Sequence, residues 1–235
     1  MEGKYKLDWT FFCHGLPMSS DTLSSGKALG GSETACIQIA QTLAKQGHRP
    51  IVFCNTQDQQ SQDGVQYLPI GWIQQKNGSS FPKGFFDYVR STPHDVLVVM
   101  RLPGILQWEF QSKVNFLWQH DLATKTGPSN FNMTCWNVDR VFVLSEFMKR
   151  QYQEVHGGPD TLYHVTRNGI DLSLIDAVPE QERDRFKIMF TSRPERGLDI
   201  MLREVLPRVL KREPKATLYI SRYDDVATLP LYQEC

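Results

Sequence analysis

Short apolar runs alternate with amphipathic stretches along most of this chain, and this alternation is the feature that most constrains its fold. Several runs, such as residues 96–99, are apolar at every position, which is typical of a parallel strand covered by helices on both faces. The pattern predicts an α/β protein with a Rossmann-like parallel sheet and helices on both faces. We expect strands at residues 7–12, 50–55, 65–70, 95–101, 114–119, 140–144 and 162–166.

Two helices have clear start and stop signals. For the helix after the first strand, Ser32 is predicted as the N-cap, Glu33 places an acidic group in the first turn, and Gly47 ends the helix. A second helix is predicted to begin after Ser145 and to end near Gly157. Both helices follow strands, as βα units require.

The composition changes after residue 171, which indicates a domain boundary. Residues 1–178 are predicted to form one Rossmann-like domain, and the polar residues 179–185 a linker. Residues 186–235 are then expected to hold only the first βαβ unit of a second domain, too little to be stable alone. Pro207 lies inside the predicted helix of this unit and should kink or split it. The unit's expected elements are a strand at 186–191, a helix at 198–210 and a strand at 216–220.

Charge and hydropathy exclude several classes of protein. Lys plus Arg and Asp plus Glu are both 26, so a basic surface for nucleic acid is not expected. No apolar run approaches the roughly 18 residues of a membrane span, and no signal peptide pattern is present. We therefore expect a cytoplasmic protein without a transmembrane segment. The basic pair Lys149 and Arg150 is interpreted as a solvated helix face, with peripheral contact to an anionic membrane as the alternative.

The cysteine and histidine spacings predict no metal site. Neither Cys-x-x-Cys nor His-x-x-x-His occurs, and no Asp-x-Asp is present to hold a divalent cation. An odd number of cysteines scattered through apolar runs is typical of reduced core residues. The five are Cys13, Cys36, Cys54, Cys135 and Cys235.

The loop at residues 24–33 lies between the first strand and the first helix, where open parallel sheets bind ligands. Gly30 and Gly31 would let the backbone approach a ligand, and free N–H groups at the helix start favour an anion such as phosphate. A flexible turn is the competing interpretation. The loop lacks the Walker pattern, and the chain has no Gly-x-Gly-x-x-Gly dinucleotide fingerprint.

A second strand-to-helix loop, at residues 191–198, carries two arginines. Arg193 and Arg196, stiffened by Pro194, would concentrate positive charge at a helix start and suit a diphosphate. The alternative is a surface loop with an ion pair to Glu195.

His120 follows a central strand and could donate a hydrogen bond to a sugar hydroxyl or to a substrate oxygen. A structural histidine is the alternative to this catalytic role.

Together these residues resemble the GT-B glycosyltransferases, and among them the retaining family 4 that uses nucleotide-diphosphate sugars. The resemblance extends from the first strand to about residue 220. It rests on five motifs, residues 30–33, His120, residues 141–145, residues 168–171 and residues 192–197. In the last motif, Arg196 stands where the family usually has Lys.

The resemblance implies a hexosyltransferase-like enzyme that moves a sugar from a nucleotide-diphosphate sugar to a carbohydrate, lipid or other hydroxyl acceptor. It further implies retention of configuration without a metal. By the same resemblance, Gly30, Gly31, Arg193 and Arg196 bind the donor diphosphate, and His120 contacts the donor sugar.

The family's glutamate pair for the donor sugar and ribose is not reached by residue 235. The 235-residue chain is therefore expected to be weakly active or inactive. The alternative function is a non-catalytic sugar-binding or interaction module derived from the GT-B fold.

Overall fold

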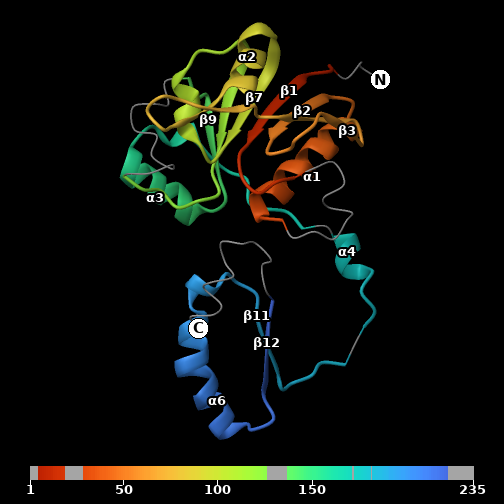
Figure 1. The fold of residues 1–235 in the computed structure, drawn as a ribbon, viewed down its shortest axis with the longest axis vertical. Coiled ribbons are helices and arrows are strands. Elements are labelled where there is room, and N and C mark those ends of the chain that lie inside the picture. The colour runs from red at the N-terminus through yellow and green to blue at the C-terminus, as the bar shows by residue number, and fades with distance from the viewer. Residues whose placement is uncertain (1–4, 19–28, 126–136, 171, 181, 222–235) are drawn as a thin grey trace. The chain divides into compact units, whose positions relative to one another are not determined.

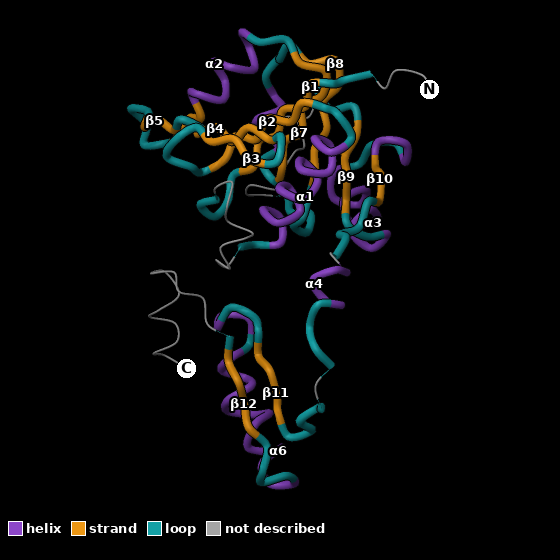
Figure 2. The backbone as a smooth tube through the Cα atoms, turned by 90° about the vertical axis from the view of Figure 1, so that its right-hand side faces the viewer, coloured by secondary structure: helices purple, strands orange, loops and turns teal. Residues whose placement is uncertain are grey.

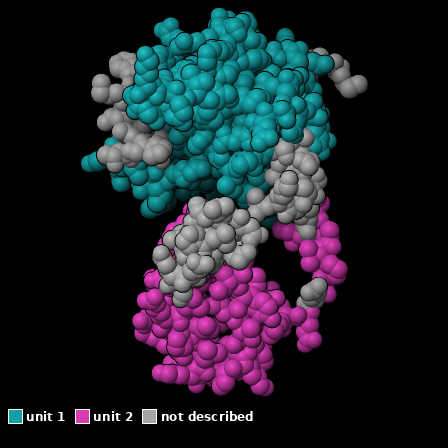
Figure 3. Space-filling model, in the orientation of Figure 1, with its two compact units in different colours: residues 1–170 teal, residues 171–235 magenta. Residues whose placement is uncertain are grey.

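The computed structural model describes residues 5–18, 29–125, 137–170, 172–180 and 182–221 (Figure 1). The chain divides into two compact units, residues 1–170 and residues 171–235, which Figure 3 colours separately. The domain boundary predicted after residue 178 lies slightly further along the chain. The first unit carries most of the secondary structure.

The first unit contains an eight-stranded sheet in the order β10-β9-β8-β7-β1-β2-β4-β3. All neighbouring strands are parallel except β3, which is antiparallel to β4. Every strand predicted in this part of the chain is present, within about two residues. The sheet strands are β1 (Asp8–Cys13), β2 (Arg49–Cys54), β3 (Gln60–Gln62), β4 (Val65–Pro69), β7 (His94–Met100), β8 (Ser112–Trp118), β9 (Arg140–Val143) and β10 (Tyr163–Val165).

Helices cover both faces of this sheet, as predicted (Figure 2). The helix α1 (Gly31–Lys45) packs on the face that holds Phe11, whereas α2 (Lys83–Ser91) and α3 (Glu146–His156) pack on the opposite face with Phe12. Successive β1 residues thus enter different cores, as strand geometry requires. The short elements of this unit are the antiparallel strands β5 (Trp72–Gln74) and β6 (Ser80–Pro82) and the 3₁₀ turns η1 (Pro103–Gln107) and η2 (Asp160–Leu162).

The start of α1 differs from the sequence prediction. Gly30, not Ser32, occupies the N-cap position, and no side chain caps the helix there. The backbone N–H of Thr34 already donates to the Gly30 carbonyl at 3.0 Å, so the helix begins earlier than expected. The hydroxyl of Ser32 instead donates to the carboxylate of Glu33 at 2.9 Å. The predicted N-cap is therefore wrong, because the glutamate takes the hydroxyl that would have capped the helix.

The other predicted helix signals are confirmed. Gly47 has a φ of +92° and ends α1, and Gly157, with a φ of +72°, follows the end of α3. The Ser145 hydroxyl accepts a hydrogen bond from the Met148 backbone N–H at 3.1 Å, as an N-cap does. On α3, Lys149 forms an ion pair with Asp160 at 2.7 Å.

The second unit has a two-stranded parallel sheet of β11 (Lys187–Phe190) and β12 (Thr217–Ile220). The predicted helix between these strands is present but split, as Pro207 suggested. Because Pro207 has no N–H to donate to residue 203, a π-helical turn replaces regular helix just before it. The connecting segments are η3 (Pro194–Arg196), α5 (Leu198–Ile200), the π-helical turn η4 (Met201–Val205) and α6 (Leu206–Arg212), and α4 (Leu172–Asp176) precedes β11.

Three of the predicted core cysteines, Cys13, Cys36 and Cys54, are buried free thiols. A hydrogen bond with Cys13, followed by burial, raises the pKa of Cys36, and burial raises the pKa of Cys54 to about 12. The thiols of Cys36 and Cys54 are therefore protonated at neutral pH. Cys135 and Cys235 lie outside the described residues. Within the described ranges, no helix is long and apolar enough to cross a membrane.

Candidate functional site

The strand order reverses between β1 and β7. From β1 the chain proceeds to β2 and β4 on one side, and from β7 it proceeds to β8, β9 and β10 on the other. Open α/β sheets bind ligands in the crevice that such a reversal leaves beyond the carboxyl ends of the strands. The topology alone therefore predicts a ligand site at the ends of β1, β7 and β8.

Polar side chains follow these strand ends at the same level. Cys13, Met100 and Trp118 are paired across β1, β7 and β8, so the residues after them leave the sheet together. The residues that follow are His14 and Gly15 after β1, Arg101 after β7, and His120 and Asp121 after β8.

The start of α1 lies at the same end of the sheet, because Glu33 on α1 accepts a hydrogen bond from the Leu16 backbone N–H after β1. Gly30 and Gly31 open this helix, and the Glu33 carboxylate packs directly against Gly30. The same carboxylate acts electrostatically on His120. The structure therefore brings Gly30, Gly31 and His120 of the predicted site into one region of the first unit.

His120 is a neutral imidazole at physiological pH. Burial, and next the positive charge of Arg101, lower the pKa of His120 from 6.5 to about 4. Its ring lies against Trp118, with the ring centroids 4.9 Å apart, and its Nε2 atom is buried with no hydrogen-bond partner in the described part of the chain. A neutral histidine with an unmet hydrogen bond suits contact with a hydroxyl better than contact with a phosphate.

Arg101 and Asp121 form a two-point ion pair beside His120. Nε of Arg101 donates to Oδ2 of Asp121 at 2.6 Å, and Nη2 donates to Oδ1 at 3.2 Å. The hydroxyl of Tyr152 donates to the Asp121 carbonyl at 3.0 Å, which anchors the same loop to α3. Arg101 has a φ of +64°, a backbone conformation that is uncommon for residues other than glycine. These contacts hold the loop that carries His120.

His14 completes this end of the sheet. Burial, and then the charge of Arg101, lower the pKa of His14, and its ring packs edge-on against Trp72 at 5.1 Å. Asn55 joins the neighbouring segments, because its amide donates to the Gly15 carbonyl at 2.7 Å and accepts from the Trp72 indole at 3.0 Å. The segment after β1 is thus fixed by side chains from β2's end and from β5.

Sequence reasoning missed His14, Arg101 and Asp121 as site residues. A signal was available for His14 and Arg101, because each directly follows an apolar strand at the reversal of strand order. Recognising it required the strand order, which the sequence pattern leaves open.

In the second unit, Arg193 and Arg196 lie between β11 and α5, in the strand-to-helix loop where they were predicted. The ion pair expected for a surface loop is also present, since Nε of Arg193 lies 2.6 Å from Oε1 of Glu195. Gly197, with a φ of +106°, turns the chain into α5. The diphosphate contacts of the two arginines stay a prediction.

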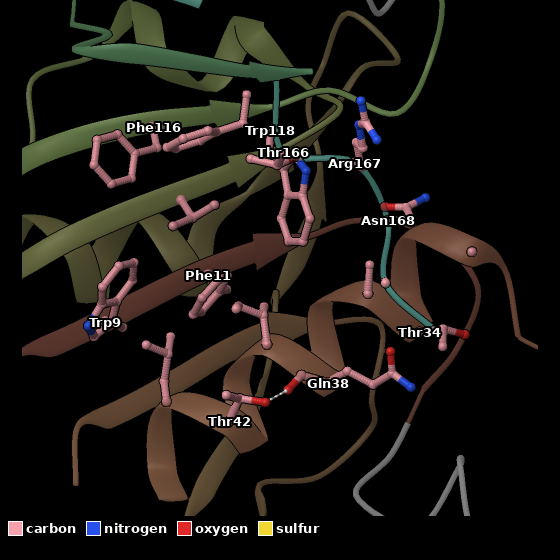
Figure 4. Close-up of a pocket in the computed structure, with 17 residues that line it drawn as sticks. Trp9, Phe11, Thr34, Gln38, Thr42, Phe116, Trp118, Thr166, Arg167 and Asn168 are labelled. Atoms are coloured by element: carbon pink, nitrogen blue, oxygen red, sulfur yellow. Dashed lines mark hydrogen bonds between the residues drawn. The ribbon is translucent and has the colours of Figure 1, made fainter. Parts of the chain in front are cut away.

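A cavity of about 600 Å³ lies beside the crevice, between α1 and the sheet (Figure 4). Its walls are largely apolar and include Trp9, Phe116 and Trp118 from the strands. Of the predicted site residues in this unit, Gly31 lines the cavity, whereas Gly30 and His120 do not. The cavity therefore reaches the predicted site at Gly31 but does not include Gly30 or His120.

The fold thus defines an α/β domain with polar residues gathered at the carboxyl edge of a parallel sheet. The family model for Glycosyltransferase Family 4 matches residues 29–174, more than half of the chain, and the chain belongs to this family.

Two solved structures resemble it. A glycosyltransferase from Rickettsia africae ESF-5 has a TM-score of 0.57 and 12% identity, over 93% of this chain and 69% of that one. The apo form of the lipopolysaccharide outer core galactosyltransferase WaaB has a TM-score of 0.52 and 15% identity, over 96% of this chain and 71% of that one. These likenesses support a GT-B fold. A search of curated proteins gave no match.

Proposed function

We propose that this chain transfers a sugar from a nucleotide-diphosphate sugar to an acceptor hydroxyl, with retention of configuration and without a metal. The observation that carries the proposal is the neutral, half-buried His120 beside the glycine-opened start of α1, in a domain of glycosyltransferase family 4. Arg193 and Arg196 of the second unit supply the positive charge for the donor diphosphate.

Each group has a distinct part in the proposed reaction. His120, as a neutral imidazole, hydrogen-bonds a hydroxyl of the donor sugar. Charge grows on the diphosphate as its bond to the anomeric carbon breaks, and the guanidinium groups of Arg193 and Arg196 stabilise it. The acceptor oxygen bonds to the anomeric carbon on the same face, and its proton passes to the departing diphosphate.

The magnitude of this stabilisation can be bounded. Removing one preorganised hydrogen-bond donor from a developing charge typically lowers the rate by about 10²- to 10³-fold. We therefore expect Arg193→Ala and Arg196→Ala each to lower sugar transfer by at least about 10²-fold.

The test is release of nucleoside diphosphate from a panel of UDP-, GDP- and ADP-sugars, with a mixture of hydroxyl acceptors and with or without EDTA. We expect slow release from one donor class, unaffected by EDTA, and a product whose anomeric configuration matches the donor. Release abolished by EDTA would contradict the metal-free mechanism. Binding of a nucleotide sugar without any release would instead favour the non-catalytic module.

A further inference from the structure

Glu33 lies in the first turn of α1 and is buried, which is unusual for an acidic residue. Its side chain is 3% exposed, and it is the one buried carboxylate among the described residues. Such a group must be hydrogen-bonded to be tolerated. Oε1 accepts from the backbone N–H of Leu16 at 2.9 Å, and Oε2 accepts from the Ser32 hydroxyl at 2.9 Å. Because Leu16 follows β1, this carboxylate ties the segment after β1 to the start of α1.

Two glycines provide the space that the carboxylate fills. A Cβ atom on Gly15 would lie 1.8 Å from Oε1 of Glu33, and one on Gly30 would lie 2.3 Å from Oε2. Gly30 has a φ of −73°, which any residue can adopt. The carboxylate, rather than the backbone conformation, therefore requires glycine at position 30.

Gly31 differs from its neighbour. Apart from its chain neighbours and the backbone of α1, no heavy atom of the described residues lies within 4 Å of where its Cβ would be, and the residue borders the cavity shown in Figure 4. The two adjacent glycines thus face different surroundings, since one packs against Glu33 and the other borders open space.

The charge of Glu33 also matters for the crevice. The carboxylate interacts electrostatically with Arg101, His14 and His120, so it lies near the polar residues that follow the strands. A carboxylate at the start of α1 offsets the positive end of the helix dipole against Gly30. An anionic ligand is therefore disfavoured at Gly30 itself.

We propose that Glu33 is a positioning residue whose carboxylate, seated between Gly15 and Gly30, fixes the start of α1 so that the backbone at Gly31 faces the ligand. The inference rests on the proposed transfer reaction. It assigns different roles to the two glycines that were predicted to bind the diphosphate together. Gly30 packs against Glu33, and Gly31 contacts the donor.

The packing part is tested without any substrate, by thermal unfolding of Gly30→Ala, Glu33→Ala and the double variant in the full chain. All five tryptophans lie within residues 1–170, so their fluorescence reports on the first unit. We expect Gly30→Ala to lower Tm by about 4 °C in the wild-type background and by less than half as much beside Glu33→Ala. Equal losses in the two backgrounds would overturn the packing role. Gly31→Ala is the matched control and should leave Tm unchanged or slightly higher, because alanine favours helix.

The positioning part is tested by turnover, measured well below the Tm of each variant. We expect Glu33→Ala to lower kcat by about 10²-fold with a much smaller change in KM, because misplaced groups slow the reaction more than binding. Glu33→Gln should restore kcat to within about threefold of wild type. Its amide can accept from Leu16 and donate to the Ser32 hydroxyl, so both hydrogen bonds survive.

Two results would overturn the positioning role, wild-type turnover in Glu33→Ala or equal losses in Glu33→Ala and Glu33→Gln. A wild-type chain with no turnover on any donor would refute the proposed function. The unfolding cycle would still decide whether Glu33 and Gly30 are coupled.

Discussion

The two units build parallel strands from similar residues and bury them very differently. In the first unit, Leu97 and Leu117 are fully buried, because strands flank them on both sides and helices cover their faces. In the second unit, Met189 and Tyr219 are 56% and 46% exposed on a two-stranded sheet. The comparison teaches that apolar sequence predicts a strand, whereas the number of neighbouring strands and helices decides whether that strand forms a core.

The difference in stability between the two units should be largest when each unit is expressed alone. Residues 1–170 expressed alone should unfold cooperatively, whereas residues 171–235 alone should show no cooperative transition, because their described part buries little beyond Pro194 and Leu198. Circular dichroism during heating measures both. A sharp transition in the 171–235 fragment would contradict the claim that this unit lacks a stable core.

Leucine-to-alanine substitutions in the two sheets test the same difference in burial. Leu117→Ala on β8 should lower the free energy of unfolding by about 3 kcal/mol, because it leaves a cavity in a closed core. Leu218→Ala on the partly exposed β12 should cost less than about 1 kcal/mol. Urea denaturation, followed by tryptophan fluorescence for the first variant and by circular dichroism for the second, gives both values. Equal costs would contradict the account.

The pH dependence of the first unit should report on His120. Because the folded pKa is about 4 and the ordinary value is 6.5, the unfolded chain takes up a proton first as the pH falls. Stability from this group is complete above pH 6.5 and is lost towards pH 4, by about 2–3 kcal/mol. His120→Asn should therefore flatten the decline between pH 6.5 and 4 in urea denaturation. A variant whose decline matches wild type would show that His120 titrates normally.

The smallest expected effect concerns Gln119, next to His120. It is fully buried, and neither of its side-chain amide atoms has a hydrogen-bond partner in the described part of the chain. A buried amide without partners costs free energy, so Gln119→Met should raise the free energy of unfolding by about 1 kcal/mol. Urea denaturation of the first unit measures the change, and a loss of stability would mean that the amide has partners in solution.

The sequence predicted the sheet strands well because their signals are local. Runs such as β7 are apolar on both faces, and Ser145 and Gly157 delimit α3 by ordinary capping chemistry. The three-residue strands β3, β5 and β6 were missed, since nothing in so short and exposed a segment sets a period. The helix α2 was also missed, because its apolar pair Phe85 and Phe86 follows Pro82 and Gly84, which are typical of turns.

The site could be predicted only in part. The glycine pair and His120 stand at recognisable places between a strand and a helix or after a strand. The ion pair of Arg101 with Asp121 joins residues after different strands, so it depends on strand order. The packing around Glu33 depends on Gly15 and Gly30 both lying against its carboxylate, which their spacing in the sequence does not indicate.

The central claim is that the crevice at the ends of β1, β7 and β8 contacts the donor sugar. Its most direct measurement is the rate of nucleoside diphosphate release by His120→Asn, with His156→Asn as control. His156, on α3, also has a pKa lowered by burial but lies outside the crevice. The account predicts a loss of about 10²-fold or more for His120→Asn and wild-type release for His156→Asn. Wild-type release by His120→Asn would contradict it.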